Sequence, residues 1–412
     1  MEKDSTKKKR KKKTKWMKFR HKVVRRCLAI FIKPLARIMY GIKIEKFMEE
    51  QRRPYLILYN HQTAFDQFFV GLSFWQPVYY VASEDLFSNG FVSALIRYLV
   101  EPIPIKKQAT DVTAVMTCMR LAKEGGTIAI APEGNRTYSG KTEYIAPSIA
   151  TLAKKIKLPI ALYRIEGGYG VQPRWSDKTR KGKMRSYVSR VIEPEEYASM
   201  SYEELYSLIQ KELYVDEGIA DAMFKSGKKA EYLERAMYVC PYCGLSEFES
   251  NGNETECKKC HKKISYGEDK TLSGIGFEFP YKFVTEWYDA QKKFVCNLDL
   301  APYYDTPMYT DKAKVSEVIV YKRKAALKET AEIKLYGNRI VVDEGKDSPM
   351  VLPFEEISAV SVLGRNKLNI YHDRKIYQLK GDKRFNALKY VNMYYHHKFI
   401  SKGEGDEQFL GL

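Results

Sequence analysis

Short apolar runs alternate with helix-like stretches between residues 51 and 192. Six runs are predicted to be buried strands, namely YLILYN (55–60), VYYVAS (78–83), PIPI (102–105), TIAIAP (127–132), PIALYRIEG (159–167) and MRSYVSRVI (184–192). Between them, 88–99, 109–124 and 147–156 carry apolar residues at helical spacing. Strands that alternate with helices indicate an α/β domain whose mixed or mostly parallel sheet is flanked by helices.

The chain of 412 residues is too long for one typical core of about 100–200 residues, so two or three folded units are expected. Its content of 44% hydrophobic and 29% charged residues is that of a folded protein. No apolar run approaches the ~20 residues that a bilayer-spanning helix needs, so we expect no membrane crossing.

The net charge of +19 is concentrated at the start of the chain, where residues 1–46 hold 18 Lys or Arg against 3 acidic residues. We expect a disordered basic tail, followed by amphipathic helices that are broken near Pro34. Their apolar positions include Trp16, Phe19, Val23, Cys27, Ile30 and Phe31. Attraction to an anionic membrane surface is the favoured reading. A helix packed on the protein's own core is the alternative, and a nucleic-acid arm comes third.

Four of the seven cysteines form one cluster, Cys240-x2-Cys243 and Cys257-x2-Cys260, with thirteen residues between the pairs. This spacing predicts a zinc ribbon over 238–268, in which four thiolates close a tetrahedral shell around a structural Zn²⁺. Two disulfides or four idle thiols are the alternatives. They fit poorly with the reducing cytoplasm that the remaining scattered cysteines indicate.

After about residue 277 the chain alternates polar and apolar residues with a period of two. The segments 331–345, 356–364 and 367–381 are predicted strands with turns at Gly337-Asn338, Gly364-Arg365-Asn366 and His372-Asp373. A helix over 383–398 is predicted to close this region.

His61 and Asp66 stand five residues apart after the first buried run. Five residues on one helix place two side chains about 140° apart, so they can meet only if His61 precedes the helix and Asp66 lies in its first turn. The carboxylate would then hold one ring nitrogen and leave the other to accept a proton from a hydroxyl. The alternative is an ordinary turn between a strand and a helix.

A second candidate segment is APEGNRTYSG (131–140), which follows another predicted strand. Gly134 lets the backbone approach a ligand, and Arg136 can grip a phosphate with paired N–H donors. Lys106 and Lys107 lie at a further strand end. Taken one at a time, each segment is better explained by turn chemistry and solvated charge.

Together and in this order, the segments resemble the glycerolipid acyltransferase family over roughly 47–192. The family's N-H-x4-D motif corresponds to Asn60, His61 and Asp66. Its F-P-E-G-T-R-S motif corresponds to Ala131, Pro132, Glu133, Gly134, Asn135, Arg136 and Thr137. Its V-P-I strand corresponds to Leu158, Pro159 and Ile160. The closest match to the F-I-D-R motif is 104–107, where Lys107 stands in place of arginine.

The resemblance implies an acyltransferase domain over 47–235 in which His61 is the general base and Asp66 orients it. It further implies that Lys107 and Arg136 hold the acceptor's phosphate and that Glu133, Gly134 and Asn135 shape the site. Lysine at 107 keeps the charge but loses the bidentate fork of arginine. This change and Asn135 leave the acceptor's head group open. The strand-rich tail resembles pleckstrin-homology-like domains, and 277–400 is assigned to such a domain.

The expected function is transfer of a fatty acyl group from a coenzyme A or acyl-carrier-protein thioester to a lysophosphatidic acid-like acceptor at the cytoplasmic face of a membrane. Two alternatives remain, a different lyso-lipid acceptor and a non-catalytic scaffold that binds lipid or nucleic acid. The chain length of the acyl group and the oligomeric state are left open.

Overall fold

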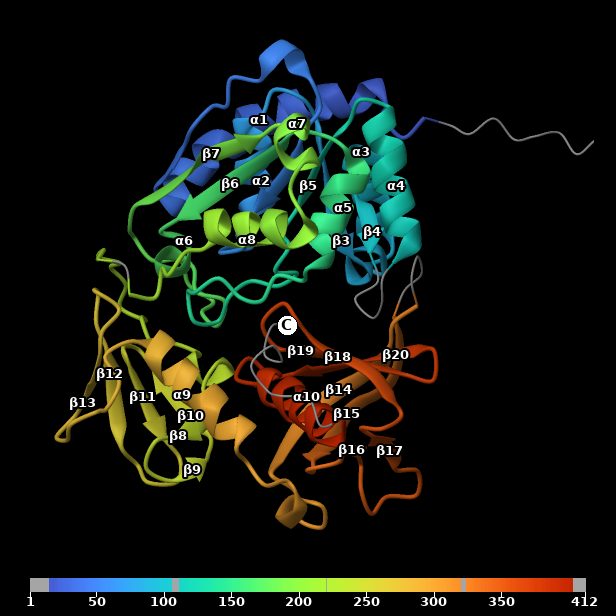
Figure 1. Ribbon diagram of the computed structural model, residues 1–412. Helices are drawn as coiled ribbons and strands as arrows, with labels where there is room; N and C mark the ends of the chain where they lie inside the picture. The colour runs from blue at the N-terminus through green and yellow to red at the C-terminus, as the bar shows by residue number, and fades with distance from the viewer. Residues whose placement is uncertain (1–14, 106–110, 220, 320–323, 403–412) are drawn as a thin grey trace, which may run out of the picture.

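The computed structural model describes residues 15–105, 111–219, 221–319 and 324–402. Figure 1 shows three regions, an α/β region that lies above two β-rich regions standing side by side. The α/β region precedes the cysteine-containing region in the chain, and the C-terminal β-region comes last. The predicted Lys107 and the basic stretch 1–14 lie outside the described residues.

The α/β region is built on a mixed sheet in the order β1-β7-β6-β2-β5-β3-β4. Its strands are β1 (Ile42–Ile44), β2 (Leu56–Tyr59), β3 (Val78–Ser83), β4 (Ile103–Ile105), β5 (Thr127–Ile130), β6 (Ile160–Glu166) and β7 (Met184–Ile192). β6 and β7 pair antiparallel, whereas the other neighbouring strands pair parallel. The six predicted strands and the mixed sheet are therefore confirmed. β1 is an addition, and it draws the end of segment 1–46 into the sheet.

Helices cover the two faces of this sheet (Figure 1). They are α1 (Phe19–Tyr40), α2 (Asp66–Ser73), α3 (Phe91–Val100), α4 (Val112–Lys123), α5 (Ser148–Ile156), α6 (Gly168–Val171), α7 (Pro194–Ala198) and α8 (Tyr202–Leu213). Leu56, Leu58 and Ile128 face a core shared with α4, α5 and α8, and Ile57 and Ala129 face a second core shared with α1 and α2. Such strands, buried on both faces, read as continuous apolar runs in the sequence.

The predicted break of the first helix at Pro34 is wrong. α1 runs through Pro34 without interruption and ends at Gly41, whose φ of 60° is left-handed. A proline inside a helix removes one hydrogen bond. Here the helix is held by packing on both sides of Pro34, because His21, Ala36 and Tyr40 are all buried. This packing offsets the lost bond.

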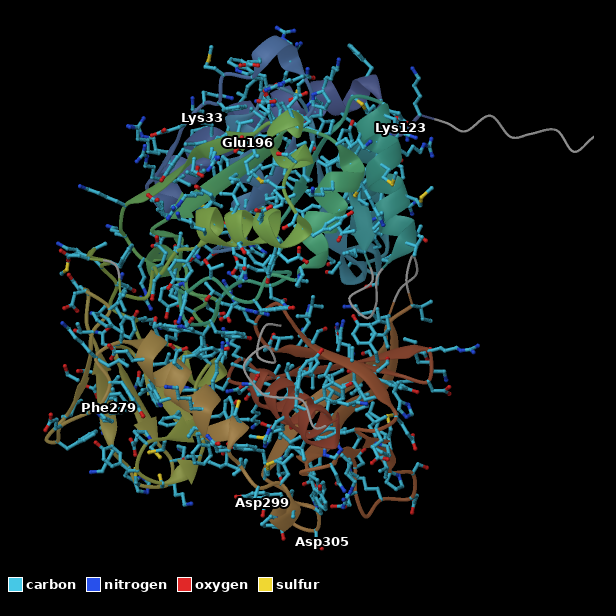
Figure 2. All side chains as sticks on the ribbon, viewed as in Figure 1. Lys33, Lys123, Glu196, Phe279, Asp299 and Asp305 are labelled. Atoms are coloured by element: carbon cyan, nitrogen blue, oxygen red, sulfur yellow. The ribbon has the colours of Figure 1, made fainter. Side chains whose placement is uncertain are left out.

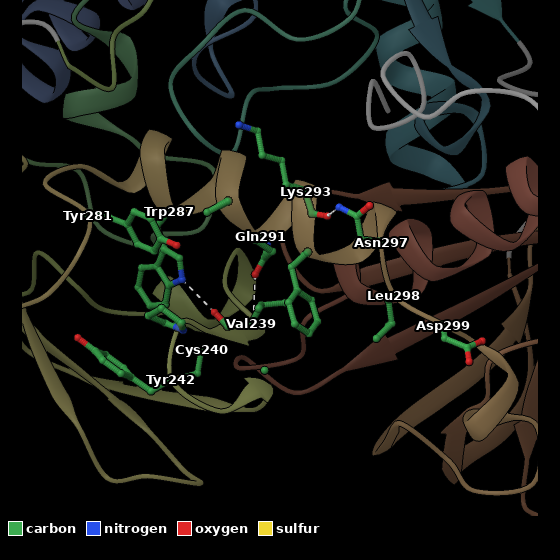
Figure 3. Close-up of a pocket in the computed structure, with 14 residues that line it drawn as sticks. Val239, Cys240, Tyr242, Tyr281, Trp287, Gln291, Lys293, Asn297, Leu298 and Asp299 are labelled. Carbon is green, nitrogen blue, oxygen red and sulfur yellow. Dashed lines mark hydrogen bonds between the residues drawn. The ribbon is translucent and has the colours of Figure 1, made fainter.

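The cysteine-containing region consists of two small antiparallel sheets and one helix. Its elements are β8 (Val239–Cys240), β9 (Gly244–Leu245), β10 (Phe248–Asn251), β11 (Glu254–Cys257), β12 (Lys263–Tyr266), β13 (Leu272–Gly274) and α9 (Val284–Cys296). The helix α9 was not expected from the sequence. Figure 3 shows Trp287 and Gln291 of α9 directed at the strands. The indole N–H of Trp287 donates to the carbonyl of Val239 at 2.9 Å, and Gln291 Oε1 accepts from Tyr238 N at 2.8 Å.

The C-terminal region is an antiparallel sheet in the order β17-β16-β15-β14-β20-β19-β18, with one helix packed against it. Its elements are β14 (Tyr309–Glu317), β15 (Ala325–Leu335), β16 (Arg339–Val342), β17 (Met350–Pro353), β18 (Ile357–Leu363), β19 (Lys367–His372), β20 (Lys375–Gly381) and α10 (Leu388–Lys402). The three predicted turns are confirmed. The closing helix begins at Leu388 rather than at residue 383. At its start, Asn386 Oδ1 accepts from Lys389 N at 3.0 Å.

The two β-rich regions share one hydrophobic core. It joins Phe248 and Cys257 of the cysteine region with Val360 and Leu388 of the C-terminal region. Trp175, from the loop between α6 and β7 of the α/β region, is part of the same core and is fully buried. Side chains of the α/β region and of the regions below it extend into the space between the ribbons (Figure 2).

Among the residues that the structure describes, no helix combines the length and the apolarity that a bilayer-spanning segment needs.

Candidate active site

His61 and Asp66 meet as the sequence predicts. β2 ends at Tyr59, His61 lies in the following turn, and Asp66 is the first residue of α2. His61 Nδ1 lies 2.8 Å from Asp66 Oδ2. A carboxylate accepts this bond, so the ring carries its proton on Nδ1 and leaves the lone pair of Nε2 available. No residue of the described segments makes a hydrogen bond to Nε2.

The carboxylate of Asp66 is fully buried and held from several sides. The backbone N–H of Gln62 donates to Oδ2 at 2.7 Å, and that of Thr63 donates to both oxygens at 2.9 and 3.0 Å. The Thr63 hydroxyl donates to Oδ1 at 2.5 Å. The N-terminus of α2 adds a favourable dipole. The orientation of His61 is therefore fixed by a rigid acid rather than by a mobile surface group.

Glu133 connects the second candidate segment to His61. Its Oε1 accepts from the backbone N–H of His61 at 2.8 Å, and its Oε2 accepts from the N–H of Glu143 at 2.9 Å. Burial raises the pKa of Glu133 to about 8, although both N–H donors oppose the rise. Gly134, with a φ of 69°, turns the chain directly after it. Glu133 thus connects, by hydrogen bonds, the two loops that follow the carboxyl ends of β2 and β5.

Arg136 is buried, whereas an anion site on the surface requires an exposed cation. Its side chain is buried, and its Nη1 has no hydrogen-bond partner within the described ranges. Burial and the charges of Arg174 and Arg365 lower the pKa of Arg136 to about 10. The guanidinium of Arg174 donates to the carbonyl of Arg136 at 2.8 Å and contacts Asn135 Oδ1 at 3.5 Å.

A cavity of about 1340 Å³ opens beside His61. His61, Glu133, Gly134 and Asn135 line it, and Arg136 does not belong to its lining. The rest of the wall is largely apolar and comes from α1, α2, β3, α3, α4 and α5, with further residues from β18 and α10. In α/β sheets, ligands bind beyond the carboxyl ends of the strands, and this cavity lies at that edge. Its size and apolar walls suit a lipid.

Two residues of this site were missed from the sequence. Thr63 holds Asp66, and its position three residues before the acid was an available signal. Arg174 joins the loop of Asn135 to the C-terminal region, where it donates to the carbonyl of Val362 at 3.3 Å. No local pattern marks Arg174, because its partners are distant in the chain.

Residues 41–165 match the family model described as Acyltransferase. This match covers less than half of the chain, and His61, Asp66 and the loop 131–137 lie inside it. A similar protein is the 1-acyl-sn-glycerol-3-phosphate acyltransferase of Bacillus subtilis (strain 168), with 22% identity over 127 residues. The alignment covers 31% of this chain and 60% of that protein.

Among solved structures, the 1-acyl-sn-glycerophosphate (LPA) acyltransferase PlsC from Thermotoga maritima aligns with a TM-score of 0.39 and 23% identity. That alignment covers 46% of this chain and 77% of the other.

A second candidate site, for a metal, lies in the cysteine-containing region. The sulfur atoms of Cys240, Cys243, Cys257 and Cys260 all lie within 4.8 Å of one another. Cys243 and Cys257 are 3.5 Å apart, and Cys240 and Cys260 are 3.8 Å apart. Four thiolates about 2.3 Å from one Zn²⁺ are separated by about 3.8 Å, so the cluster fits zinc. His261 turns away and pairs with Glu256 instead.

A smaller cavity of about 590 Å³ lies between α9 and the segment of β8 and β9 within the cysteine-containing region (Figure 3). Tyr242, Trp287 and Phe294 are among its lining residues.

Proposed function

We propose that this protein transfers a fatty acyl group from an acyl thioester to the free hydroxyl of a lysophosphatidic acid-like acceptor at a membrane surface. His61 Nε2 takes the proton of the acceptor hydroxyl as its oxygen attacks the thioester carbonyl. Asp66 holds the ring and stabilises the imidazolium that forms. The C–S bond then breaks, the leaving sulfur takes the proton from His61, and the ester is formed without an acyl-enzyme.

One observation carries the proposal, the His61–Asp66 pair at 2.8 Å beside a large apolar cavity. A buried strand-end histidine with an acid partner could be purely structural. Here the ring lines a cavity that is large enough for an acyl chain, and Glu133 fixes the position of its backbone. The acyltransferase match over the same residues supports this chemistry.

The remaining roles are part of the same proposal. Glu133, Gly134 and Asn135 shape the acceptor end of the site. Arg136 and Lys107 provide positive charge for an anionic head group. Arg136 does so from behind the cavity wall, where its Nη1 has no hydrogen-bond partner among the described residues. The donor is acyl-coenzyme A or an acyl-carrier-protein thioester. The cysteine cluster holds a structural Zn²⁺ in a zinc ribbon, and the C-terminal region is pleckstrin-homology-like.

The membrane assignment rests on α1. One face of this helix lines the cavity through His21, Leu28 and Ile32, whereas Ile30 and Ile38 on another face are 71% and 82% exposed. Exposed lysines and arginines on α1 add attraction to anionic lipid. A helix with these two faces gives a lyso-lipid a route from the bilayer to His61. We place the protein at the cytoplasmic face of a membrane, as a peripheral protein.

The test is a panel assay on the purified full chain. Lyso-lipids with different head groups are offered together with labelled acyl-coenzyme A or acyl-carrier-protein, and the products are resolved by mass. We expect the wild-type protein to acylate lysophosphatidic acid or a close relative, and His61→Ala to lower kcat by about 10²–10⁴-fold.

His372→Ala is the matched control, because His372 also pairs with a carboxylate, at 3.0 Å from Glu356, but lies in the C-terminal region and does not line the large cavity. This variant should retain wild-type kcat. Equal activity of His61→Ala and the wild type would refute the proposal. Binding of nucleic acid with no acyl transfer to any acceptor would favour a scaffold instead.

A further inference from the structure

The large cavity is not enclosed by the acyltransferase domain alone. Ala359, Val360 and Ser361 of β18 and Tyr395 of α10 also line it. In Figure 1, β18 and β19 lie directly beneath the α/β region. The match to the acyltransferase family ends at residue 165 and includes none of these residues. We propose that β18 is the wall that limits the size of the acceptor head group. This inference rests on the proposed function.

The alternation along β18 identifies the side chains that face the site. Val360 and Val362 belong to the core of the C-terminal region, and Val360 touches the cavity only at its edge, next to Ala359 and Ser361. Because side chains alternate along a strand, Ala359 and Ser361 point to the opposite face, toward the α/β region. Both are buried, and both have small side chains. A wall of small residues leaves space that a larger side chain would take from the ligand.

β18 lies at the acceptor end of the cavity rather than along the acyl chain. Arg174 places it there, because Nη2 of this buried guanidinium contacts both Asn135 Oδ1 at 3.5 Å and the Val362 carbonyl at 3.3 Å. One guanidinium therefore contacts both β18 and the loop that contains Glu133. The apolar part of the wall, where an acyl chain would lie, comes instead from α1, α3, α4 and α5.

The junction that carries this wall is anchored by charge. Asp177, two residues after the fully buried Trp175, accepts from Arg235 Nη1 at 2.8 Å and from Arg365 Nη1 at 3.0 Å. Arg365 belongs to the β18–β19 turn, so this turn is held against the α/β region by an ion pair as well as by packing. A wall held in a fixed position can exclude large head groups, whereas a mobile wall would move aside for them.

The test compares Ser361→Phe with Ser358→Phe in the full-length protein. Ser358 is on the same strand but is exposed and does not line the cavity, so it controls for the substitution itself. The readout is kcat/KM for lysophosphatidic acid, lysophosphatidylethanolamine and lysophosphatidylglycerol, with circular dichroism to verify folding. For the largest head group that the wild type accepts, Ser361→Phe should lower kcat/KM by about tenfold or more. Ser358→Phe should stay within about twofold of wild type on every acceptor.

Equal profiles of the two variants would overturn the inference, even with an active wild type. A wild type that acylates no lyso-lipid would instead refute the proposed function. In that case, or if Ser361→Phe does not fold, the wall is tested on the wild-type protein with a lysophosphatidic acid analogue that carries a small diazirine on its phosphate. Labelling within residues 357–363 is expected after irradiation. Labelling confined to the α/β region, or no labelling, would overturn the inference.

Discussion

Glu133 is the residue on which the geometry of the site depends most directly. Its two oxygens hold the backbone N–H groups of His61 and Glu143, so one carboxyl joins the turn after β2 to the loop after β5. The side chain is 2% exposed, and burial disfavours its charged form. The site therefore contains an acid whose protonation differs between the folded and unfolded chain.

This difference predicts a pH dependence of stability. The pKa of Glu133 is raised from 4.5 to about 8 on folding, so the folded chain binds more protons than the unfolded chain between these values. Stability from this group is then fully present below pH 4.5 and is lost as pH rises through 8. Between pH 5 and pH 8, the free energy of unfolding of the wild type should fall by on the order of 3 kcal/mol relative to Glu133→Gln.

Urea unfolding of both proteins at pH 5, 6, 7 and 8 measures this difference. The variant is less stable at low pH, because an amide presents only one acceptor to two N–H groups. The gap between the two proteins should narrow as pH rises. A gap that stays constant with pH would show that Glu133 has the same charge in both states.

At the scale of elements, α1 links the outside of the molecule to the cavity. Its inner face carries His21, whose Nδ1 lies 3.0 Å from the Tyr79 hydroxyl, and its outer face carries apolar side chains without a protein partner among the described residues. In Figure 1, α1 lies at the top of the α/β region, away from the two β-rich regions. Lys33 of α1 also lies on this side in Figure 2.

We predict that Ile30→Glu/Ile38→Glu weakens binding to anionic vesicles by about tenfold or more, because two apolar side chains no longer enter the lipid interface and two negative charges are added. Co-flotation with phosphatidylglycerol vesicles measures the effect. The control is Ile275→Glu/Val351→Glu, which places the same charges at two exposed positions of the β-rich regions, 47% and 48% exposed. Equal loss in both double variants would contradict a membrane role for α1.

The sequence predicted some elements well and others not at all, for physical reasons. The strands β2, β5 and β6 were predictable because each is a short buried run between turn residues. β1 was missed because its three residues gain their pairing from β7, which is distant in the chain. α9 was missed although Val284, Trp287, Tyr288, Gln291 and Val295 are buried at helical spacing. Two of these residues are aromatic and two are valines, types that are also common in strands, and an alternating strand pattern follows directly.

Within the site, too, local contacts were predictable and contacts between distant segments were not. His61 and Asp66 were predictable because their contact is local, five residues apart. The hydrogen bond between Glu133 and His61 joins residues that are 72 positions apart in the chain, and the hydrogen bond between Arg174 and Val362 joins residues that are 188 positions apart. Contacts of that range have no local signature, so a single sequence does not predict them.

At the scale of the whole molecule, the cysteine cluster supports more than its own region. Cys240 and Cys257 belong to the same core as Val360 and Leu388 of the C-terminal region. The loop of the α/β region that carries Trp175 enters this core as well. A metal that fixes the four thiolates therefore stabilises the surface against which both neighbouring regions pack.

We predict that the purified protein binds one zinc ion per chain and that Cys257→Ser, or removal of the metal by a chelator, lowers Tm by about 10 °C or more. Metal content by mass spectrometry and thermal unfolding by circular dichroism measure the two effects. Cys27→Ser is the control, because Cys27 is an exposed cysteine on α1 outside the cluster. A metal-free protein with an unchanged Tm would contradict the assignment.

The way Trp175 is buried has a consequence for how this chain can be divided. An expression boundary at residue 165, where the family match ends, would cut β6 one residue before its end and remove β7, its antiparallel neighbour. A boundary before residue 239 would retain the indole but strip away the strands that surround it. The smallest piece that keeps the apolar surface around Trp175 covered therefore reaches from the α/β region to α10, and we expect shorter pieces to expose this surface and to aggregate.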